Sequence, residues 1–424
     1  MNLRRTAVAA LLAAAILSSC ALLTRSESRA RKEASPPSRG TVGEFRGLWV
    51  ATLANIDWPS QPGLPAEESK AEASRILDLA VSLNLNAVLF QARPAADAFY
   101  ESLYEPVSSF FTGAQGAKPE DWYDPLEFWV SEAHARGLAL HVWMNPFRAG
   151  VPGIHGYAPG APVRSRPELA RSLGNRGYYW LDPGMPEARE YVLAVAEDLL
   201  RRYPVDGLVV DDYFYPYSEY LDEGLEFPDE ISFERWKASD PSTRATVDRA
   251  DFRRESASSF LAALRDRIKS VRPEASFGIS PFGIYRPGYP PGIAGKDAYA
   301  EIYADSLGWL KGLGADYMAP QLYWPVSRIA QSYPVLLGWW VRESSGKTPI
   351  WPSILAASPS LPRELRANEA VSQIMILRGM EPDRPGFVLY GARYLLEDPD
   401  GVAEALRSGP LAEPAANPRV SPVR

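Results

Sequence analysis

The sequence contains very few cysteines and histidines. Its 424 residues include one cysteine, Cys20, and three histidines, at positions 134, 141 and 155. A single cysteine cannot close an intramolecular disulfide, so the fold is expected to be stable without disulfide bonds. These residues form no cluster at the spacing of metal ligands. We therefore expect neither a metal ion nor another cofactor.

Excess positive charge and the common nucleotide-binding motifs are also absent from the sequence. The formal net charge is −7, which argues against nucleic acid as a partner because phosphate binding requires a basic surface. There is no phosphate-binding loop, no glycine-rich dinucleotide fingerprint and no G-x-S-x-G serine elbow. Aromatic residues, in contrast, are abundant, with 12 Trp, 21 Tyr and 15 Phe. Many of them occupy polar, loop-like stretches, which a large core alone does not explain.

The N-terminal apolar run, Ala7–Leu17, is too short to span a bilayer as a helix. It follows two arginines and ends in Leu17-Ser-Ser-Cys20, which matches a secretory signal with a bacterial lipobox. We therefore predict a signal peptide over residues 1–19 and lipidation of Cys20. The alternative is an ordinary signal peptide in which the cysteine is incidental.

The residues after Cys20 indicate a location and a linker. Ala21 follows in place of an aspartate, and by resemblance to other lipoproteins this favours the outer membrane. The predicted location is the cell envelope, with a lipid anchor in the outer membrane and the protein facing the periplasm. Residues 20–43 are polar and charged and predict a flexible tether. The Pro- and Ala-rich residues 409–424 predict a disordered tail.

Between the tether and the tail, residues 44–408 repeat one pattern. An amphipathic helical stretch ends in a short turn with Gly, Asn, Pro or Asp, and a short apolar run follows. Eight such runs predict a parallel (β/α)₈ TIM barrel, and a doubly wound open sheet is the alternative. The predicted strands are 46–52, 87–90, 138–144, 208–210, 276–279, 317–322, 350–355 and 386–390.

The loops predicted at the two ends of the barrel differ in length. Every helix-to-strand turn is short, whereas the connections after strands two, three and four are long, over about 92–124, 146–185 and 213–250. In a barrel these connections lie on the C-terminal face, where active sites are built. Long insertions on this face are suited to a groove for an extended polymer.

The stretch Pro204–Pro216 places two carboxylates and three aromatic residues at the end of the fourth strand. Alternation puts Gly207, Val209 and Asp211 on one strand face, and a small glycine suits a crowded barrel interior. We therefore predict that Asp211 points inward as a catalytic nucleophile or base. Asp212, the second predicted catalytic residue, would orient loops or bond a neighbouring strand end.

Polar and aromatic residues collect at the same end of almost every predicted strand. Each has a structural alternative: Arg93 could pair with Asp97, for example, and His141 could be a core histidine. Their common position nevertheless indicates a site. Carboxylates with aromatic walls are typical of glycoside hydrolysis. The predicted substrate-binding residues are Arg93, Asp97, Trp143, Asn145, Tyr213, Tyr215, Phe282, Gln321, Tyr323 and Trp324.

The proton donor of such a reaction is not evident from the strand ends. A general acid should sit on a second strand with a raised pKa, yet no Glu closes strand five, six or seven. Asp57, Asp97 and Glu219 are candidates because of their loop positions. The spacing of the carboxyl groups, and with it a retaining or inverting outcome, stays open.

Six runs resemble the glycosyl-hydrolase-like family ten, which includes bacterial divisome-localised glycosidase lipoproteins. The resemblance covers about residues 44–406 and implies a barrel hydrolase acting on peptidoglycan glycan strands, with a preference for strands without stem peptides. It also implies roles for Asp211 and Asp212, for Arg93, Asn145 and Gln321 in the groove, and for cell-division proteins as possible partners. The runs are Glu44–Val50, Asn86–Pro94, Val142–Arg148, Val205–Pro216, Ser280–Gly283 and Ala319–Trp324.

The sequence thus predicts a cell-envelope glycoside hydrolase acting on peptidoglycan. Two alternatives remain: a non-catalytic glycan-binding lipoprotein on a degenerate barrel, and a glycosidase for another extracellular polysaccharide.

Overall fold

The computed structural model describes residues 43–154 and 156–418. The predicted signal peptide, Cys20, the tether up to residue 42 and the end of the predicted tail, residues 419–424, lie outside the described residues. Within the described part, no helix is both long enough and apolar enough to cross a bilayer.

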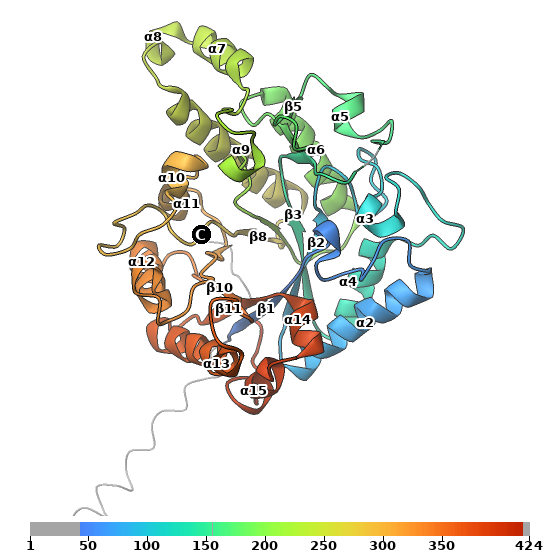
Figure 1. The fold of residues 1–424 in the computed structure, drawn as a ribbon, viewed down its shortest axis with the longest axis vertical. Coiled ribbons are helices and arrows are strands. Elements are labelled where there is room, and N and C mark those ends of the chain that lie inside the picture. The colour runs from blue at the N-terminus through green and yellow to red at the C-terminus, as the bar shows by residue number, and fades with distance from the viewer. Residues whose placement is uncertain (1–42, 155, 419–424) are drawn as a thin grey trace, which may run out of the picture. The chain divides into compact units, whose positions relative to one another are not determined.

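The centre of the fold is an eight-stranded parallel sheet surrounded by helices (Figure 1). The first and last strands of the sheet order are joined by parallel bridges, Met318 to Ile350 and Gln321 to Ser353, so the sheet closes on itself. This closure confirms the predicted TIM barrel and excludes the open sheet. In sheet order the strands are β10 (Ser353–Leu355), β11 (Gly386–Tyr390), β1 (Phe45–Val50), β2 (Ala87–Arg93), β3 (Ala139–Met144), β7 (Gly207–Val210), β8 (Ser276–Ile279) and β9 (Tyr317–Met318).

All eight predicted strands are present, each with a helix before the next strand. Helix α4 (Pro125–Ala135) shows how capping and turn residues mark the ends of a helix in the sequence. The Asp124 carboxylate accepts a hydrogen bond from the Glu127 N–H at 3.1 Å, and Gly137 turns the chain at φ 73°. The other main outer helices are α2 (Ala66–Ser82), α6 (Pro186–Arg202), α9 (Arg249–Val271), α11 (Ser306–Gly312), α12 (Tyr333–Ser344), α13 (Arg363–Met380) and α15 (Val402–Ser408). The remaining helices are α3 (Ser109–Thr112), α5 (Pro162–Ser165), α7 (Glu230–Ser239), α8 (Pro241–Arg244), α10 (Ala298–Glu301), α14 (Ala392–Glu397), η1 (Leu53–Asn55), η2 (Ser218–Tyr220) and η3 (Ile329–Gln331).

Successive residues of each strand point to opposite sides of the sheet, and each side packs into its own apolar layer. Leu208 and Val210 belong to the large layer between strands and helices, whereas Val209 belongs to a smaller cluster in the barrel interior. Gly207 is required in this interior, because a Cβ there would meet His141 Nδ1 at 2.6 Å. His141 is a core histidine, as one reading of the sequence held. It bonds the Tyr317 hydroxyl at 2.9 Å, and burial lowers its pKa to about 4.

The described residues of the long connections on the C-terminal face contain elements that the sequence did not predict. The connection after β3 forms a three-stranded antiparallel sheet of β4 (Arg148–Gly150), β5 (Ala170–Ser172) and β6 (Tyr179–Leu181). The connection after β7 carries η2, α7 and α8 before α9 begins. Figure 1 shows α7 and α8 at the outer margin of the molecule, beyond α9.

The predicted disordered tail is wrong for residues 409–418, which pack across the N-terminal end of the barrel. Leu411 is fully buried, and its carbonyl accepts a hydrogen bond from Asn84 Nδ2 at 2.7 Å. The carbonyl of Ala416 accepts from the N–H of Glu44 at 3.0 Å. Proline and alanine suggested disorder, but Asn84 and Glu44 supply the partners that fix this segment.

Candidate active site

The site is built at the C-terminal end of β7, where Asp211 and Asp212 follow the strand directly. Both side chains are almost fully buried, with 3% and 1% of their surface exposed. Asp211 continues the interior face of Gly207 and Val209 and lines a cavity above the barrel core. The alternation of the strand therefore places Asp211 where the sequence predicts it.

Neutral donors hold the Asp211 carboxylate. Trp143 Nε1 donates to Oδ2 at 2.9 Å, and Asn145 Nδ2 donates at 3.2 Å to Oδ1. The backbone N–H of Arg148 donates to Asn145 Oδ1 at 2.9 Å, which turns the Asn145 NH₂ group toward the carboxylate. Three residues at and beyond the end of β3 thus orient Asp211.

A buried cation acts on Asp211 from a distance. The Arg148 guanidinium lies 4.4 Å from the centroid of the Tyr213 ring and donates to the Pro94 carbonyl at 3.2 Å. Burial raises the pKa of Asp211, and the positive charge of Arg148, followed by the Trp143 hydrogen bond, opposes that rise. Arg148 therefore favours the ionised form of the carboxylate that faces the cavity.

Asp212 is held by a second set of neutral donors. The Tyr217 hydroxyl donates to Oδ2, and Gln321 Nε2 donates to Oδ1 at 3.1 Å. Burial, and then the negative charge of Asp211, raise the pKa of Asp212 to about 7. Of the two carboxyl groups, Asp212 is therefore the one whose pKa lies near neutral pH. The predicted bond of Asp212 to a strand end is the bond to Gln321, beyond β9.

Aromatic rings surround the cavity, which has a volume of about 130 Å³. The Trp49 and Trp143 rings meet edge to face at 5.0 Å, and the Tyr323 and Tyr390 rings stack at 5.7 Å. Phe282 and Trp324 lie edge to face at 5.6 Å beside this cavity, on the segments that carry Ser280 and Gln321. The lining residues are Trp49, Trp143, Asp211, Tyr213, Ser280, Gln321, Tyr323 and Tyr390.

Arg93 is predicted to bind substrate, but the structure buries it away from the cavity. A β-bulge between Gln91 and Arg93 breaks the alternation of β2, so Arg93 pairs with Met144 in the outer layer. Its guanidinium is fully buried and forms an ion pair with Glu105 at 2.5 Å. It also donates to the carbonyls of Asn145 and Pro146, and it therefore braces the end of β3 instead of contacting ligand.

Two further predicted substrate-binding residues are fully buried in the protein interior away from the cavity. Asp97 is fully buried behind β2, and burial raises its pKa to about 6. Tyr215 is fully buried between Phe227 and Tyr303, with ring centroids 5.2 and 5.3 Å away. Both were placed in the groove because they follow strand ends, but each loop turns them into the protein interior.

The other two proposed proton donors are also engaged elsewhere. Asp57 Oδ2 accepts from the Ala51 N–H at 2.8 Å, and Oδ1 accepts from the Arg393 N–H at the start of α14 at 2.9 Å. Glu219 is exposed and pairs with Lys296 at 3.1 Å. The pKa of Glu219 is lowered, because its hydrogen bonds and the Lys296 charge outweigh the effect of burial. Burial raises the pKa of Asp57, but backbone N–H groups occupy both of its carboxylate oxygens, and Glu219 lacks the raised pKa of a general acid.

Five site residues were absent from the predicted set. Trp49 could have been found by alternation, because it shares the interior face of β1 with Phe45. Tyr390 ends β11 and Ser280 directly follows β8, but neither was included among the predicted site residues. Tyr217 and Arg148 gave no periodic signal, because loops beyond β7 and β3 bring them to the two aspartates.

Among residues 43–154 and 156–418, no group of three or more His, Cys, Asp or Glu side chains is arranged to hold a metal ion. The cavity is lined by one carboxylate, Asp211, and the second, Asp212, is bonded to the lining residue Gln321.

Comparisons with known proteins give a consistent family. The sequence matches the model of the family described as Glycosyl hydrolase-like 10 over residues 44–352. It is 35% identical to glycosyl hydrolase YngK of Bacillus subtilis (strain 168), over 89% of this chain and 74% of that protein. It is 32% identical to glycosyl hydrolase DigH of Escherichia coli (strain K12), over 88% of this chain and 91% of that protein. In fold it is similar to the glycoside hydrolase domain of PgaB (BpsB) from Bordetella bronchiseptica, with a TM-score of 0.56 at 16% identity, over 86% of this chain and 98% of that domain.

Proposed function

The chain belongs to the Glycosyl hydrolase-like 10 family, and from this premise we propose that it is a cell-envelope glycoside hydrolase that cleaves the glycan strands of peptidoglycan. The observation that carries the proposal is the aspartate pair below the aromatic cavity. Asp211 faces the cavity under the influence of the positive charge of Arg148. The pKa of its neighbour, Asp212, is raised to about 7. Glycoside hydrolysis requires this combination of a charged and a protonated carboxyl group.

The two aspartates receive different roles. Asp211, favoured as an anion by Arg148, stabilises or attacks the positive charge that develops on the sugar ring. Asp212, with its pKa raised to about 7, supplies the proton. Tyr217 and Gln321 hold Asp212 in place through the two carboxylate oxygens.

The cavity supports a preference for peptide-free strands. Its volume of about 130 Å³ is small beside the range of about 300–1,000 Å³ for ligand pockets. The Trp49, Trp143, Tyr323 and Tyr390 rings enclose it, and they offer flat apolar faces to a sugar ring. A bare sugar unit suits such a narrow site better than one bearing a branched peptide.

We also propose that the protein acts from a lipid anchor at Cys20, in the outer membrane and facing the periplasm. The lipobox sequence and the following alanine support this location. Cell-division proteins are proposed as partners on the strength of the family resemblance alone.

Product analysis tests the proposed reaction. The protein lacking residues 1–20 and its Asp211→Asn variant are incubated with peptide-stripped glycan strands and with intact sacculi, and released saccharides are identified by mass spectrometry. We expect short saccharides from the stripped strands, and none from the variant. The matched control is Glu219→Gln, which changes a carboxylate to an amide on the exposed rim and should leave the products unchanged. Products that persist with Asp211→Asn would contradict the assignment.

A non-catalytic glycan-binding function is the second candidate, because both aspartates of the site come from one strand end. Glycosidases generally place their two carboxyl groups on opposite sides of the bond, about 5–9.5 Å apart. If glycan co-sediments with the wild type and with Asp211→Asn, and neither releases saccharides, the result would support a protein that binds glycan without cleaving it. Saccharides released only from a different extracellular polysaccharide would instead identify another substrate.

A further inference from the structure

A second pocket lies on the outside of the barrel, between the N-terminal end of α6 and helices α7, α8 and α9. Its volume is about 410 Å³, which is within the range of ligand sites. None of its lining residues belongs to the aspartate cavity. Three arginines line it, although the whole chain has a net charge of −7. The lining residues used below are Met185, Arg189, Ile231, Arg235, Trp236 and Arg244.

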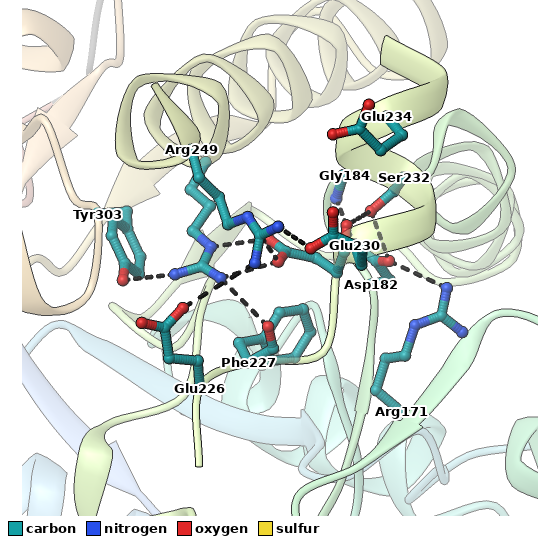
Figure 2. A network of polar contacts seen from close by, with 12 residues as sticks. Arg171, Asp182, Gly184, Glu226, Phe227, Glu230, Ser232, Glu234, Arg249 and Tyr303 are labelled. Atoms are coloured by element: carbon teal, nitrogen blue, oxygen red, sulfur yellow. Dashed lines mark hydrogen bonds and ion pairs between the residues drawn. The ribbon is translucent and has the colours of Figure 1, made fainter. Parts of the chain in front are cut away.

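Buried polar contacts fix the α7 wall of this pocket. Ser232 Oγ donates to Asp182 Oδ2 at 2.8 Å, and the Gly184 N–H donates to Asp182 Oδ1 at 2.9 Å (Figure 2). Just before α7, Asp229 accepts two hydrogen bonds from the Arg253 guanidinium, at 2.7 and 2.8 Å. The pocket is therefore held by internal contacts of the folded chain and does not depend on exposed side chains alone.

The three arginines of the pocket differ in their partners. Arg235 pairs with Glu187 at 2.5 Å, and Arg244 lies 3.7 Å from Glu255. Within the described part of the chain, Arg189 has no carboxylate oxygen within 4.0 Å, and its hydrogen bond goes to the carbonyl of Pro183 at 2.7 Å. Within the described residues, Arg189 is thus the one guanidinium of the pocket that has no carboxylate within 4.0 Å, although Asp182, Glu255 and Glu187 act on it from further away.

A half-buried Arg189 guanidinium without a close carboxylate is unfavourable unless an anion binds beside it. Arg189 is half-buried, and burial lowers its pKa. Its remaining N–H groups form a planar fork that matches a carboxylate, and hydrogen bonds between charged groups are among the strongest in proteins. The N-terminal turn of α6 beside it adds partial positive charge.

The rest of the pocket wall is mixed, with apolar side chains beside polar ones such as Ser239, Glu255 and Ser259. Met185 and the half-buried Trp236 ring lie beside the arginines, and the Arg244 guanidinium stacks 4.5 Å from the centroid of that ring. Ile231 is 74% exposed at the pocket, so a ligand confined to the cavity would leave most of this side chain in water. A ligand that extends beyond the pocket could cover it.

From these observations we propose that the pocket binds the carboxyl terminus of a peptide with an apolar last residue. The terminal carboxylate contacts the Arg189 fork, the last side chain packs on Met185 and Trp236, and the preceding residues cover Ile231. A single carboxylate matches the single unpaired guanidinium. This site is independent of the glycan cavity and of the proposed hydrolysis.

Binding of matched peptides tests the proposal. The probe is acetyl-Ala-Ala-Ala-Phe with a free carboxylate, titrated against the protein lacking residues 1–20 by calorimetry. We expect its C-terminal amide to bind about tenfold more weakly or worse, because a charge-assisted hydrogen bond is lost. Acetyl-Phe alone should also bind more weakly, because it does not reach Ile231. Equal affinities of acid and amide, or of acetyl-Phe and the tetrapeptide, would overturn the proposal.

Variants separate the site from general effects. Arg189→Gln should lose about tenfold in affinity for the acid and leave the amide unchanged, whereas Arg235→Gln, whose guanidinium is already paired, should lose much less. Arg189→Lys keeps the charge and should retain part of the affinity, which provides a test if the Gln variant folds poorly. Release of saccharides from glycan strands should be the same in all three variants. Wild-type affinity of Arg189→Gln for the acid would rule out this site.

Discussion

The buried aspartates beneath α7 are neutralised by arginines, whereas those of the cavity contact neutral donors. Asp182 Oδ2 lies 3.1 Å from Arg171 Nη2 (Figure 2), and Asp229 binds the Arg253 guanidinium through both oxygens. The Asp182–Arg171 pair lies within the connection after β3, and the Asp229–Arg253 pair joins the connection after β7 to α9. Their carboxylates have no freedom to act on a ligand.

Asp211 and Asp212 are as deeply buried but are bonded differently. Their hydrogen bonds come from the side chains of Trp143, Asn145 and Tyr217, among other uncharged groups. In the described part of the chain, no Lys or Arg nitrogen lies within 4.0 Å of either carboxylate. Neutral donors orient a carboxylate without lowering its pKa as strongly as a paired guanidinium does.

The difference indicates what distinguishes a structural from a reactive buried acid in this molecule. Burial alone does not identify the site, because all four aspartates are at most 3% exposed. The type of partner separates these four, because guanidinium groups contact Asp182 and Asp229, whereas neutral side-chain donors contact Asp211 and Asp212. Five expected outcomes test this contrast.

The largest effect is expected from Asp211→Asn. Glycan hydrolysis should fall by about three orders of magnitude or more, since the charged carboxylate of the cavity is lost. The stability should change little, because the substitution removes a charge from a desolvated site. Single-turnover rates and thermal melts of the same preparation check both statements, and a large drop in melting temperature would make Asp211 a structural residue.

Asp229→Asn should have the opposite pattern. It leaves the buried Arg253 charge without its partner, and breaking a buried ion pair costs about 3–5 kcal/mol. Urea unfolding should show this loss, while the hydrolysis rate per folded molecule should remain that of the wild type. A stable Asp229→Asn protein with impaired hydrolysis would contradict the distinction between the arginine-paired aspartates and the aspartates of the cavity.

The pH dependence should report Asp212. Its folded pKa of about 7 lies above the unfolded value of about 3.9, so the folded state binds more protons between these values. Stability contributed by this group therefore falls as pH rises from about 4 to 7 and is constant above. Relative to Asp212→Asn, the wild type should lose stability across this window in urea titrations at several pH values.

The same group should set one limb of the activity profile. If Asp212 supplies the proton, kcat/KM should decrease about tenfold per pH unit above pH 7, with a midpoint near that value. A flat profile up to pH 9 would contradict its role as proton donor without affecting the expected change in stability.

The smallest effect is expected from Arg148→Gln. Losing the buried cation should raise the pKa of Asp211 further, move the acid limb of the activity profile upward by about one pH unit and lower activity about tenfold at the optimum. Arg148→Lys, which keeps the charge, should stay close to the wild-type profile. An unchanged limb in Arg148→Gln would show that Arg148 acts only through packing on Tyr213.

The sequence predicted the regular parts of this arrangement well. Eight apolar runs identified the barrel strands, and alternation along β7 placed Asp211 on the interior face. Trp143 and Asn145 were found because they continue the interior face of β3. Wherever side-chain direction follows from strand periodicity, the prediction and the structure agree.

Irregular backbone explains most of the differences. The bulge before Arg93 turned a predicted groove residue outward, and the loop after Asp212 buried Tyr215 while bringing Tyr217 back to the carboxylate. Periodicity carries no information about such turns. The tail residues 409–418 were predicted wrongly for a similar reason, since their order depends on partners hundreds of positions away, such as Asn84.

The position of the described chain ends has a practical consequence for display and immobilisation. Residues 43 and 418 both lie at the N-terminal end of the barrel, where Glu44 bonds the Ala416 carbonyl. The aspartate cavity opens at the other end. A bead, a carrier protein or a second catalytic module joined at residue 43 or residue 418 would therefore leave the cavity unobstructed, and fusions at both positions would emerge side by side from one face.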